Sequence, residues 1–596
     1  MADAADNPPP APEPRGGIAP IKPQFILPTD HAAAAPSHRD PTPHDAAPPE
    51  DPAAPRKRQR GMNKQRDVYR PEGGVKLCMA VLDGRECSFG EGCRFSHDLR
   101  AYLAAKPADL GETCPIYTLR GHCRFGVSCR YGSAHLREDG SSVKAEGGER
   151  GADEESNLAP AALLLQLRKN QYDFSRADAL SSAFLADVQR QQAAANGGGG
   201  EAKGEAAAEA DGEAKSEEAA YGARSAEDTQ PVEKERRRVD FKGKIYLAPL
   251  TTVGNLPFRR VCKGYGVDIT CGEMAMATNL LQGQASEWAL MRRHKCEDVF
   301  GVQLAGSNAD VMGRAAQVID EQMSVDFIDI NMGCPIDVVC NRGCGSSLAQ
   351  RPGRVQSIVR TMSSVLSCPL TVKMRMGFDN NKPTAHNLIP KLHGWGAAAV
   401  TLHGRSRQQR YSKSADWEYI SSCGKLTPLP FIGNGDVFSY EDVEAEAALG
   451  GSCSAVMVAR GALVKPWIFT EIKERRHWDI SSSERLDMLK SFVTFGLEHW
   501  GTDDLGVSRV RNFLLEWLSF LHRYVPVGLL ERLPAKLQDR PPAYCGRNDL
   551  ETLMASDNAA DWIKITELVL GPVPTNFNFT PKHKANAYSG PILQEG

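Results

Sequence analysis

The sequence predicts an α/β chain built on a (β/α)8 barrel, the TIM-barrel fold, with a helical domain after it and two small metal-binding units before it. Three observations support this prediction. Short apolar runs alternate with amphipathic stretches of helical length over residues 239–478. Apolar residues recur at helical spacing over residues 479–575. Cysteine and histidine recur in two similar patterns over residues 76–137.

The short apolar runs predict eight barrel strands. They lie at residues 245–248, 269–271, 299–304, 327–330, 370–373, 399–402, 431–433 and 455–458. Eight strand–helix units in about 230 residues match the size of a TIM barrel. A doubly wound open sheet is the alternative, but no Gly-x-Gly-x-x-Gly fingerprint follows the first strand.

The segments outside these domains are assigned from composition. Residues 1–75 are rich in Pro, Ala, Asp and His, so we expect a disordered arm. Its basic patch at residues 56–70 is either a solvated run, an RNA contact or a nuclear import signal. Residues 138–238 are acidic and rich in Ala and Gly, and we expect a tether. Within it, residues 158–190 predict a short amphipathic helix that could dock on the barrel. Residues 576–596 form a tail without a clear signal.

Charge and hydropathy limit the classes of partner. The net charge is only -3, so affinity for nucleic acid must come from local patches. No run of about 18 apolar residues occurs, and the acidic, Pro-rich start differs from a secretory leader. We therefore expect a monomer without a membrane partner, acting in the cytoplasm, the nucleus or both. Its 16 cysteines should be mostly reduced.

Eight cysteine and histidine residues have the spacing of metal ligands. Cys78, Cys87, Cys93 and His97 give C-x8-C-x5-C-x3-H, and Cys114, Cys123, Cys129 and His135 give C-x8-C-x5-C-x5-H. Three thiolates and an imidazole satisfy one tetrahedral Zn²⁺, and the metal replaces the core that so short a segment cannot build. We predict two structural zinc ions. His135 departs from the first spacing by two residues, and scattered cysteines in a loop-rich region are the alternative.

Both units resemble the CCCH fingers of RNA-binding proteins. Aromatic and basic residues lie among the ligands: Phe89, Arg94 and Phe95 in the first unit, and Arg124, Phe125, Arg130 and Tyr131 in the second. Rings can stack on unpaired bases while guanidinium groups hold phosphates, or the rings can shield the metal instead. For the two units together we expect RNA contact.

Polar and glycine-rich residues follow the predicted strands. Because the loops after barrel strands build the active site, we expect these residues to converge on one face. They are Pro249, Leu250, Thr251, Gln303, Asn331, Cys334, Lys373, Arg375, His403, Arg405, Asn434, Gly435, Asp436, Ala459 and Arg460. Barrels bind a phosphate through glycines and an arginine in the loops after strands seven and eight, and both are present here. That phosphate belongs to a phosphorylated substrate or to a mononucleotide cofactor.

Several of these loops together resemble the tRNA-dihydrouridine synthases. The matching motifs are Ala248-Pro249-Leu250-Thr251, Gln303-Leu304-Ala305-Gly306-Ser307, Asp329-Ile330-Asn331-Met332-Gly333-Cys334-Pro335, Val372-Lys373-Met374-Arg375, Leu402-His403-Gly404-Arg405 and Asn434-Gly435-Asp436. The resemblance covers residues 244–475, and Asn-Met-Gly-Cys-Pro is its most specific part. Two CCCH fingers joined to such a barrel further resemble the eukaryotic class that acts on uridine 47 of tRNA.

The resemblance implies a role for each site residue. The flavin ring of FMN would contact the backbone of Pro249, Leu250 and Thr251, and its polar edge would bond Gln303 and Lys373. The phosphate end would lie against His403, Asn434, Gly435, Asp436, Ala459 and Arg460. In common bacterial members a glycine stands where this chain has Ala459.

The resemblance also implies the chemistry. NADPH or NADH would reduce FMN, reduced FMN would deliver hydride to C6 of a uridine in tRNA, and Cys334 would protonate C5. A free thiol has a pKa of about 8.5, so it is mostly protonated at neutral pH. Donors near the uracil oxygens would support the developing charge, and Asn331, Lys373, Arg375, His403 and Arg405 are the candidates.

Two other interpretations compete with this one. A flavin barrel acting on a free pyrimidine would use the same bond and the same thiol, but it needs neither fingers nor a helical domain. An RNA-binding protein without catalysis would carry no flavin.

In the resembled family the helical domain binds tRNA, and Arg509, Arg511, Lys536, Arg540 and Arg547 lie in that region here. Messenger RNA is a further potential substrate. Cys340 and Cys344 could form a cluster or disulfide with Cys334, although no histidine joins them.

Overall fold

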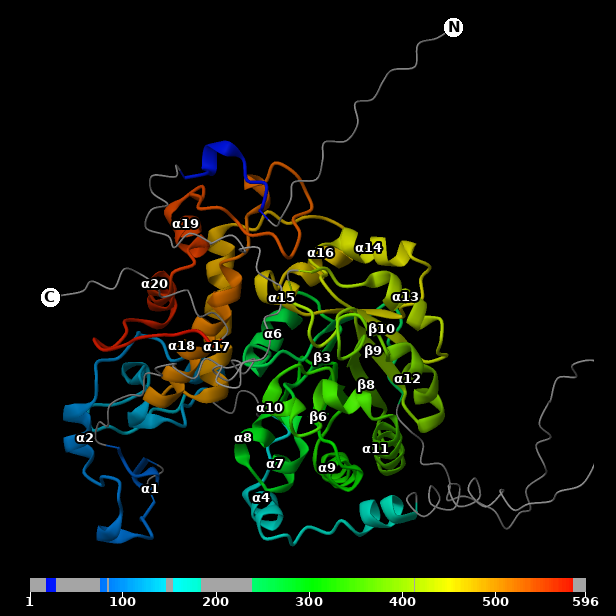
Figure 1. The fold of residues 1–596 in the computed structure, drawn as a ribbon. Coiled ribbons are helices and arrows are strands. Elements are labelled where there is room, and N and C mark those ends of the chain that lie inside the picture. The colour runs from blue at the N-terminus through cyan, green and yellow to red at the C-terminus, as the bar shows by residue number, and fades with distance from the viewer. Residues whose placement is uncertain are drawn as a thin grey trace, which may run out of the picture.

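The structure is a computed structural model, and it describes residues 18–27, 76–82, 85–145, 154–183, 238–411 and 413–582. Three lobes are visible: a barrel, a set of long helices beside it, and the fingers (Figure 1). The basic patch at residues 56–70 and most of the acidic tether lie outside the described residues. Among the helices that the structure describes, none is long and apolar enough to cross a bilayer.

The barrel is closed and entirely parallel. Its strands are β2 (Ile245–Leu247), β3 (Ile269–Cys271), β6 (Val299–Ala305), β7 (Phe327–Met332), β8 (Leu370–Arg375), β9 (Ala399–His403), β10 (Phe431–Asn434) and β11 (Ala455–Val458). They are hydrogen-bonded in the order β3-β2-β11-β10-β9-β8-β7-β6, and β3 pairs with β6 to close the ring. The eight predicted strands are therefore confirmed, and the open doubly wound sheet is excluded.

Aromatic packing at one end of the barrel shows why these strands fit together. Tyr246 and Phe241 meet the Phe327 ring edge-on, with ring centroids 5.9 and 6.1 Å away. Gly301 on the neighbouring strand leaves room for that ring, since a Cβ there would lie 2.2 Å from it. Such close packing makes changes of side-chain volume costly in a core.

Helices surround the barrel on its outer side (Figure 1). They are α6 (Leu256–Gly264), α9 (Ala309–Gln322), α11 (Pro352–Val365), α12 (Ala385–Leu392), α13 (Trp417–Gly424), α14 (Tyr440–Ala448), α15 (Arg460–Val464) and α16 (Ile468–Glu474). A small insertion, which the sequence analysis missed, lies between β3 and β6. It contains β4 (Ala275–Met276), α7 (Ala277–Leu281), α8 (Ala285–Trp288) and β5 (Arg293–His294).

The C-terminal region is helical, as predicted. It contains α17 (Ser482–Trp500), α18 (Asp504–Leu521), α19 (Asp549–Ala555) and α20 (Ala559–Leu570). A capping box between Ser481 and Glu484 begins α17. Trp517 of α18 packs on Phe258 of α6 and donates a hydrogen bond to the carbonyl of Leu463, so the domain is joined to the barrel wall.

Two segments predicted to be disordered or to serve as a tether pack on the folded domains instead. Residues 18–27 pair with the helical domain at Ile18–Arg540, Ile21–Leu530 and Ile26–Tyr544. In residues 154–183, Leu163 and Leu167 of α4 (Ala161–Arg168) are buried in the barrel's hydrophobic core. The prediction of a disordered arm over 1–75 is thus wrong for residues 18–27. Within the predicted tether, the short helix expected in residues 158–190 is present as α4 and lies on the barrel. Apolar contact with a distant surface repays the entropy of ordering both segments.

The docked segment 154–183 explains the amphipathic pattern seen in the sequence. Arg168 donates two hydrogen bonds to the carbonyl of Gly283, and Asp178 forms an ion pair with Arg314 on α9. Residues 155–156 form β1 (Glu155–Ser156), which pairs with β5 of the barrel insertion. The chain from the fingers is therefore fastened to the barrel before it reaches the first barrel strand.

Candidate active site and metal centres

A cavity of about 590 Å³ opens at the C-terminal ends of the barrel strands. All fifteen residues predicted for catalysis, substrate support or cofactor binding line it: Pro249, Leu250, Thr251, Gln303, Asn331, Cys334, Lys373, Arg375, His403, Arg405, Asn434, Gly435, Asp436, Ala459 and Arg460. The sequence therefore predicted which side chains meet, and their individual roles are taken up below.

The loop that carries Cys334 is held by a chain of buried amides. The Asn331 side-chain oxygen accepts hydrogen bonds from the backbone N–H groups of Gly333 and Cys334, at 3.2 and 2.9 Å. The Asn331 amide donates to Gln303 Oε1 at 2.7 Å, and Gln303 Nε2 donates to Asp329 Oδ2 at 2.7 Å. Asn331 was predicted to support the substrate. Its side-chain oxygen instead holds the loop that carries Cys334, and its NH2 group is bonded to Gln303.

The Cys334 side chain is a free thiol, as are Cys340 and Cys344. Cys340 donates a hydrogen bond from its sulfur to the carbonyl of Cys334 at 3.4 Å. Among the described residues, these three cysteines do not form a group with metal-binding geometry, so the cluster and the disulfide find no support. Burial raises the pKa of Cys334, which keeps the thiol protonated at neutral pH.

Cationic side chains form one wall of the cavity. Burial and the nearby Arg375 lower the pKa of Lys373 to about 8, and its ammonium lies 3.3 Å from Asn434 Oδ1. Burial and the surrounding cations, Arg375 first among them, hold the pKa of His403 well below its usual value. His403 is therefore a neutral imidazole at pH 7 and a poor proton donor. Arg375 donates to the carbonyl of Gly333 at 2.8 Å and so braces the Cys334 loop.

The loops after β10 and β11 also line the cavity. Asp436 accepts hydrogen bonds from Arg405 on one carboxylate oxygen and from Arg460 on the other. Asp436 has a φ of +48°, in the left-handed region that aspartate tolerates better than most residues. Asn434, at the end of β10, donates to the carbonyl of Met457 in β11 at 2.8 Å, which joins the two strands where the loops begin. One carboxylate thus positions two guanidinium groups.

Three further residues line the cavity, and the sequence did not predict that they would do so. Tyr411 stacks on His403 with ring centroids 6.5 Å apart, and the Arg460 guanidinium lies 4.1 Å from its ring centre. Arg523 and Arg540 reach the cavity from the helical domain. Tyr411 lies eight residues beyond the end of β9, and the two arginines lie in another domain, so no strand-end rule could find them.

The cavity has the donor set that a flavin mononucleotide requires. Arg460 is close to the glycine-containing loop at Gly435, where a phosphate can approach the backbone. The ammonium of Lys373 is buried and donates one hydrogen bond, to the amide oxygen of Asn434. The electron-rich edge of a flavin ring would accept hydrogen bonds from the other N–H groups of this ammonium. Pro249, Leu250 and Met274 supply apolar surface for a flat ring.

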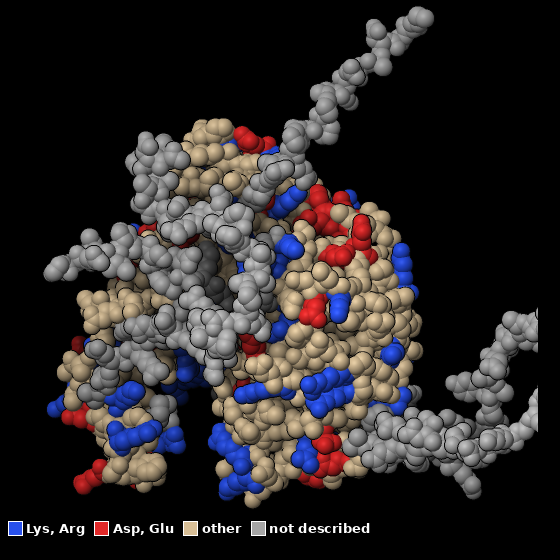
Figure 2. Space-filling model, in the orientation of Figure 1, with Lys and Arg blue, Asp and Glu red and all other residues tan. Residues whose placement is uncertain are grey.

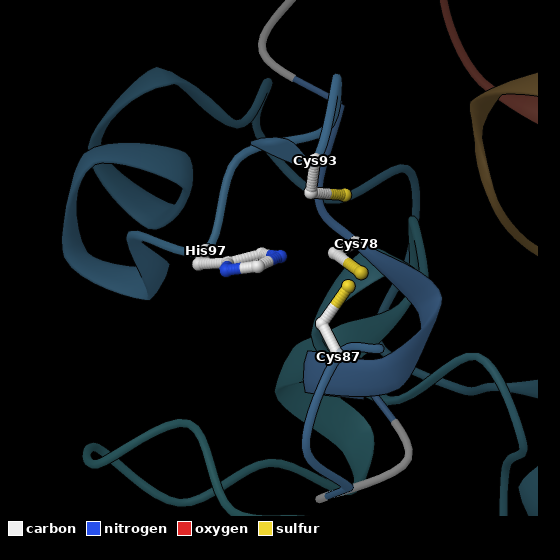
Figure 3. Close-up of side chains that lie close together, drawn as sticks. All are labelled: Cys78, Cys87, Cys93 and His97. Carbon is white, nitrogen blue, oxygen red and sulfur yellow. The ribbon is translucent and has the colours of Figure 1, made fainter. Parts of the chain in front are cut away.

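The two predicted metal centres are both assembled. In each, one ligand atom from every residue lies within 4.8 Å of the others. Cys78, Cys87, Cys93 and His97 point toward a common centre (Figure 3). In the second group, both ring nitrogens of His135 are buried without a hydrogen-bond partner among the described residues. A buried imidazole without partners is costly, and a zinc ion would satisfy it, so His135 fits as the fourth ligand despite its longer spacing.

Comparison with known proteins identifies the family. Residues 246–502 match the family model described as Dihydrouridine synthase (Dus), and residues 74–105 match the one described as DUS3L CCCH zinc finger domain. A relative from Homo sapiens, named tRNA-dihydrouridine(47) synthase [NAD(P)(+)]-like, is 51% identical and covers 91% of this chain and 86% of its own length. This chain belongs to the dihydrouridine synthase family.

The likeness to other members of the dihydrouridine synthase family extends to plants and fungi. A relative of the same name from Arabidopsis thaliana is 42% identical over 96% of this chain and 93% of its own length. The tRNA-dihydrouridine(47) synthase [NAD(P)(+)] of Coprinopsis cinerea is 40% identical over 96% of this chain and 98% of its own length. The fingers, barrel and helical domain of this synthase therefore occur together in its relatives.

The second finger of this synthase is built into the helical domain. Arg130 forms an ion pair with Asp504 at 2.6 Å, and its backbone N–H donates to the carbonyl of Thr502 at 2.8 Å. The Phe125 ring packs over Gly501, where a Cβ would lie 2.4 Å from it. All four ligands of the second centre are buried, whereas His97 of the first is exposed.

This packing separates the aromatic residues of the two fingers. Tyr131 and Phe125 contribute to the core that the second finger shares with α17 and α18, so we assign them to packing. Phe89 in the first finger is 74% exposed and stays available for a base. In the helical domain, Arg511 is buried against the carbonyl of Gly571, and Arg547 pairs with Asp479 and Glu551. These two arginines stabilise the domain rather than face RNA.

Loss of the second metal should destabilise more of the protein than loss of the first. For Cys129→Ser we expect the helical domain to melt at a lower temperature, since the finger that packs on Gly501–Thr502 comes apart. For Cys87→Ser we expect an unchanged melting of the helical domain. Differential scanning calorimetry with zinc quantification measures both, and equal shifts for the two variants would contradict the packing argument.

The activity of this synthase should fall as the pH rises through about 8. Lys373 is an ammonium below its pKa of about 8 and a neutral amine above it, so its support for negative charge is lost on the alkaline side. The Cys334 thiol titrates at higher pH because its pKa is raised. We expect Lys373→Arg to move the alkaline limb of the kcat/KM profile to higher pH. If Lys373→Arg leaves the alkaline limb of the profile at the same pH, a group other than Lys373 causes the loss of activity.

Proposed function

We propose that this protein reduces the C5–C6 bond of a uridine in tRNA to give 5,6-dihydrouridine. The observation that carries the proposal is the free Cys334 thiol in the same cavity as two arginines held by one aspartate. Family membership and the names of the relatives support it. NADPH or NADH is the proposed source of electrons, since the relatives' names contain NAD(P).

In this proposal the cavity would hold FMN, which when bound and reduced would supply the hydride that reaches C6 of uracil. Arg460 and the Asn434–Asp436 loop, which line the cavity, would hold its phosphate, and Lys373 would bond the polar edge of its ring. Asp436 keeps Arg460 oriented by accepting its hydrogen bond at 2.7 Å. The apolar residues Pro249 and Leu250 exclude water from one face of the ring.

Cys334 delivers the proton to C5. The thiol proton leaves sulfur, the new C–H bond forms at C5, and a thiolate remains to be reprotonated by solvent. His403 is neutral, so it does not compete as the acid. Lys373 and Arg375 lie beside the thiol and lower the energy of both the uracil oxygens and the thiolate as negative charge develops.

The substrate is proposed to be uridine 47 of tRNA, by analogy with the relatives' names. Arg523 and Arg540 lie on the rim that the helical domain contributes, where they can hold phosphates that flank the target nucleotide. A free pyrimidine has no such phosphates. Uridines of unpaired mRNA segments share the same chemistry and are a second proposed substrate. The cytoplasm and nucleus, where tRNA is made and used, are the proposed compartments.

Cys334→Ala should slow uridine reduction by at least about 100-fold, the usual contribution of a general acid. FMN content and tRNA affinity should stay the same, because the cationic side chains proposed to hold the phosphates of both are unchanged. Single-turnover reduction of a tRNA transcript, followed by mass spectrometry, measures the rate. Cys344→Ala is the matched control, since Cys344 is a buried free thiol on the same loop.

The same assay decides between substrates. We expect dihydrouridine at position 47, no product in a transcript with cytidine there, and negligible turnover of free uridine. Turnover of the free nucleoside at the rate of tRNA would overturn the proposed substrate. An unchanged rate for Cys334→Ala would overturn the proposed acid.

A further inference from the structure

A second cavity lies next to the candidate active site. Its volume is about 960 Å³, and the second finger, the barrel, the helical domain and the C-terminal segment all contribute to its wall. Thr251 lines both cavities, so they adjoin across the loop that follows β2. Lys and Arg side chains are visible on both sides of the hollow between the finger lobe and the barrel (Figure 2).

Each acidic group of this second cavity is engaged within the protein. Glu155 pairs with Arg292 at 3.5 Å, and Glu498 forms an ion pair with Arg260 at 2.6 Å. Glu273 and Glu516 accept backbone N–H groups, those of Thr252 and Lys582. The charges of Glu155 and Glu498 are therefore offset by arginines.

Two basic groups of the cavity form no ion pair among the described residues. Arg124 and Arg509 are both exposed and line the cavity. Lys582 donates to the Thr252 hydroxyl at 2.8 Å and interacts with the Glu273 carboxylate. Arg124 of the second finger and Arg509 of the helical domain thus face one cavity without an ion-pair partner in the described part of the chain.

An aromatic pair lies beside these cations. Trp500 and Phe513 stack with ring centroids 4.6 Å apart and an interplanar angle of 12°, and both line the cavity. Both are only partly buried. Flat rings beside unpaired cations are the combination that binds unpaired nucleotides, the rings by stacking on bases and the cations through phosphates.

We propose that this cavity binds an unpaired segment of the RNA substrate, a few nucleotides away from the uridine that is reduced. Arg124 and Arg509 hold phosphates, and Trp500 with Phe513 provides the surface on which a base stacks. The proposal rests on the RNA substrate proposed above. It also gives the second finger a defined role, because the ion pair between Arg130 and Asp504 fixes the wall that carries Arg124 against the helical domain.

The test compares two double variants of the full-length, zinc- and FMN-loaded protein. Arg124→Glu with Arg509→Glu reverses two charges in the cavity. Arg354→Glu with Lys391→Glu reverses two exposed charges on α11 and α12, outside both cavities, and serves as the control. Binding of a tRNA transcript is followed by fluorescence anisotropy at several salt concentrations, with competition by an oligouridylate and by an RNA duplex.

We expect the cavity variant to weaken tRNA binding by about tenfold or more and to lower the slope of log Kd against log salt by about 1.4, or 0.7 for each lost phosphate contact. The control should match the wild type. The oligouridylate should compete with tRNA for the wild type, and the duplex should not. Equal affinity and salt slope for the two double variants would overturn the proposal, as would competition by the duplex alone.

The dihydrouridine content of tRNA after incubation with the wild type is measured in parallel. If no dihydrouridine forms, the proposed reaction is contradicted. The binding data would still show whether the second cavity holds RNA.

Discussion

The hydrogen-bond chain from Asp329 through Gln303 and Asn331 to the backbone of Cys334 is the constraint on which the site depends. Each of its side chains is buried, and each link is 2.7–2.9 Å long. Thr371 adds a hydrogen bond to the other Asp329 oxygen, which anchors the chain on the strand beside it. Burial raises the pKa of Asp329 to about 6, so at neutral pH its carboxylate is the acceptor that orients the Gln303 amide. The position of the thiol is thereby set by the barrel strands rather than by a mobile loop.

Around this chain, the charges of the site follow from burial. Lys373, Arg375, Arg405 and Arg460 converge near His403, so the imidazole stays neutral and the thiol becomes the group that can give up a proton. Asp436 is the carboxylate that offsets two of these cations. Bound FMN would bring the remaining negative charge as its phosphate, which explains why so many cations can share one cavity.

The parts of this structure that the sequence predicted are those governed by local pattern. The barrel strands show as apolar runs, and the residues at their ends meet because parallel strands of a barrel present one common rim. The metal ligands show as spacing, including His135. Tyr411, Arg523 and Arg540 could not be found in this way, since they reach the cavity through a long loop or from another domain. The docking of residues 18–27 was missed because their composition resembles that of disordered chain, and only the distant apolar surface decides the outcome. The helical periodicity of residues 158–190, in contrast, did indicate the helix that docks on the barrel.

The state of the Cys334 thiol in the free enzyme tests the central claim most directly. Its pKa is measured from the rate of alkylation by iodoacetamide as a function of pH, read by mass spectrometry on the peptide that contains Cys334. The geometry predicts a midpoint above the ordinary thiol value of about 8.5, because burial disfavours the thiolate. A midpoint below neutral pH would mean that the thiolate predominates under working conditions, and the role of Cys334 as proton donor would be contradicted.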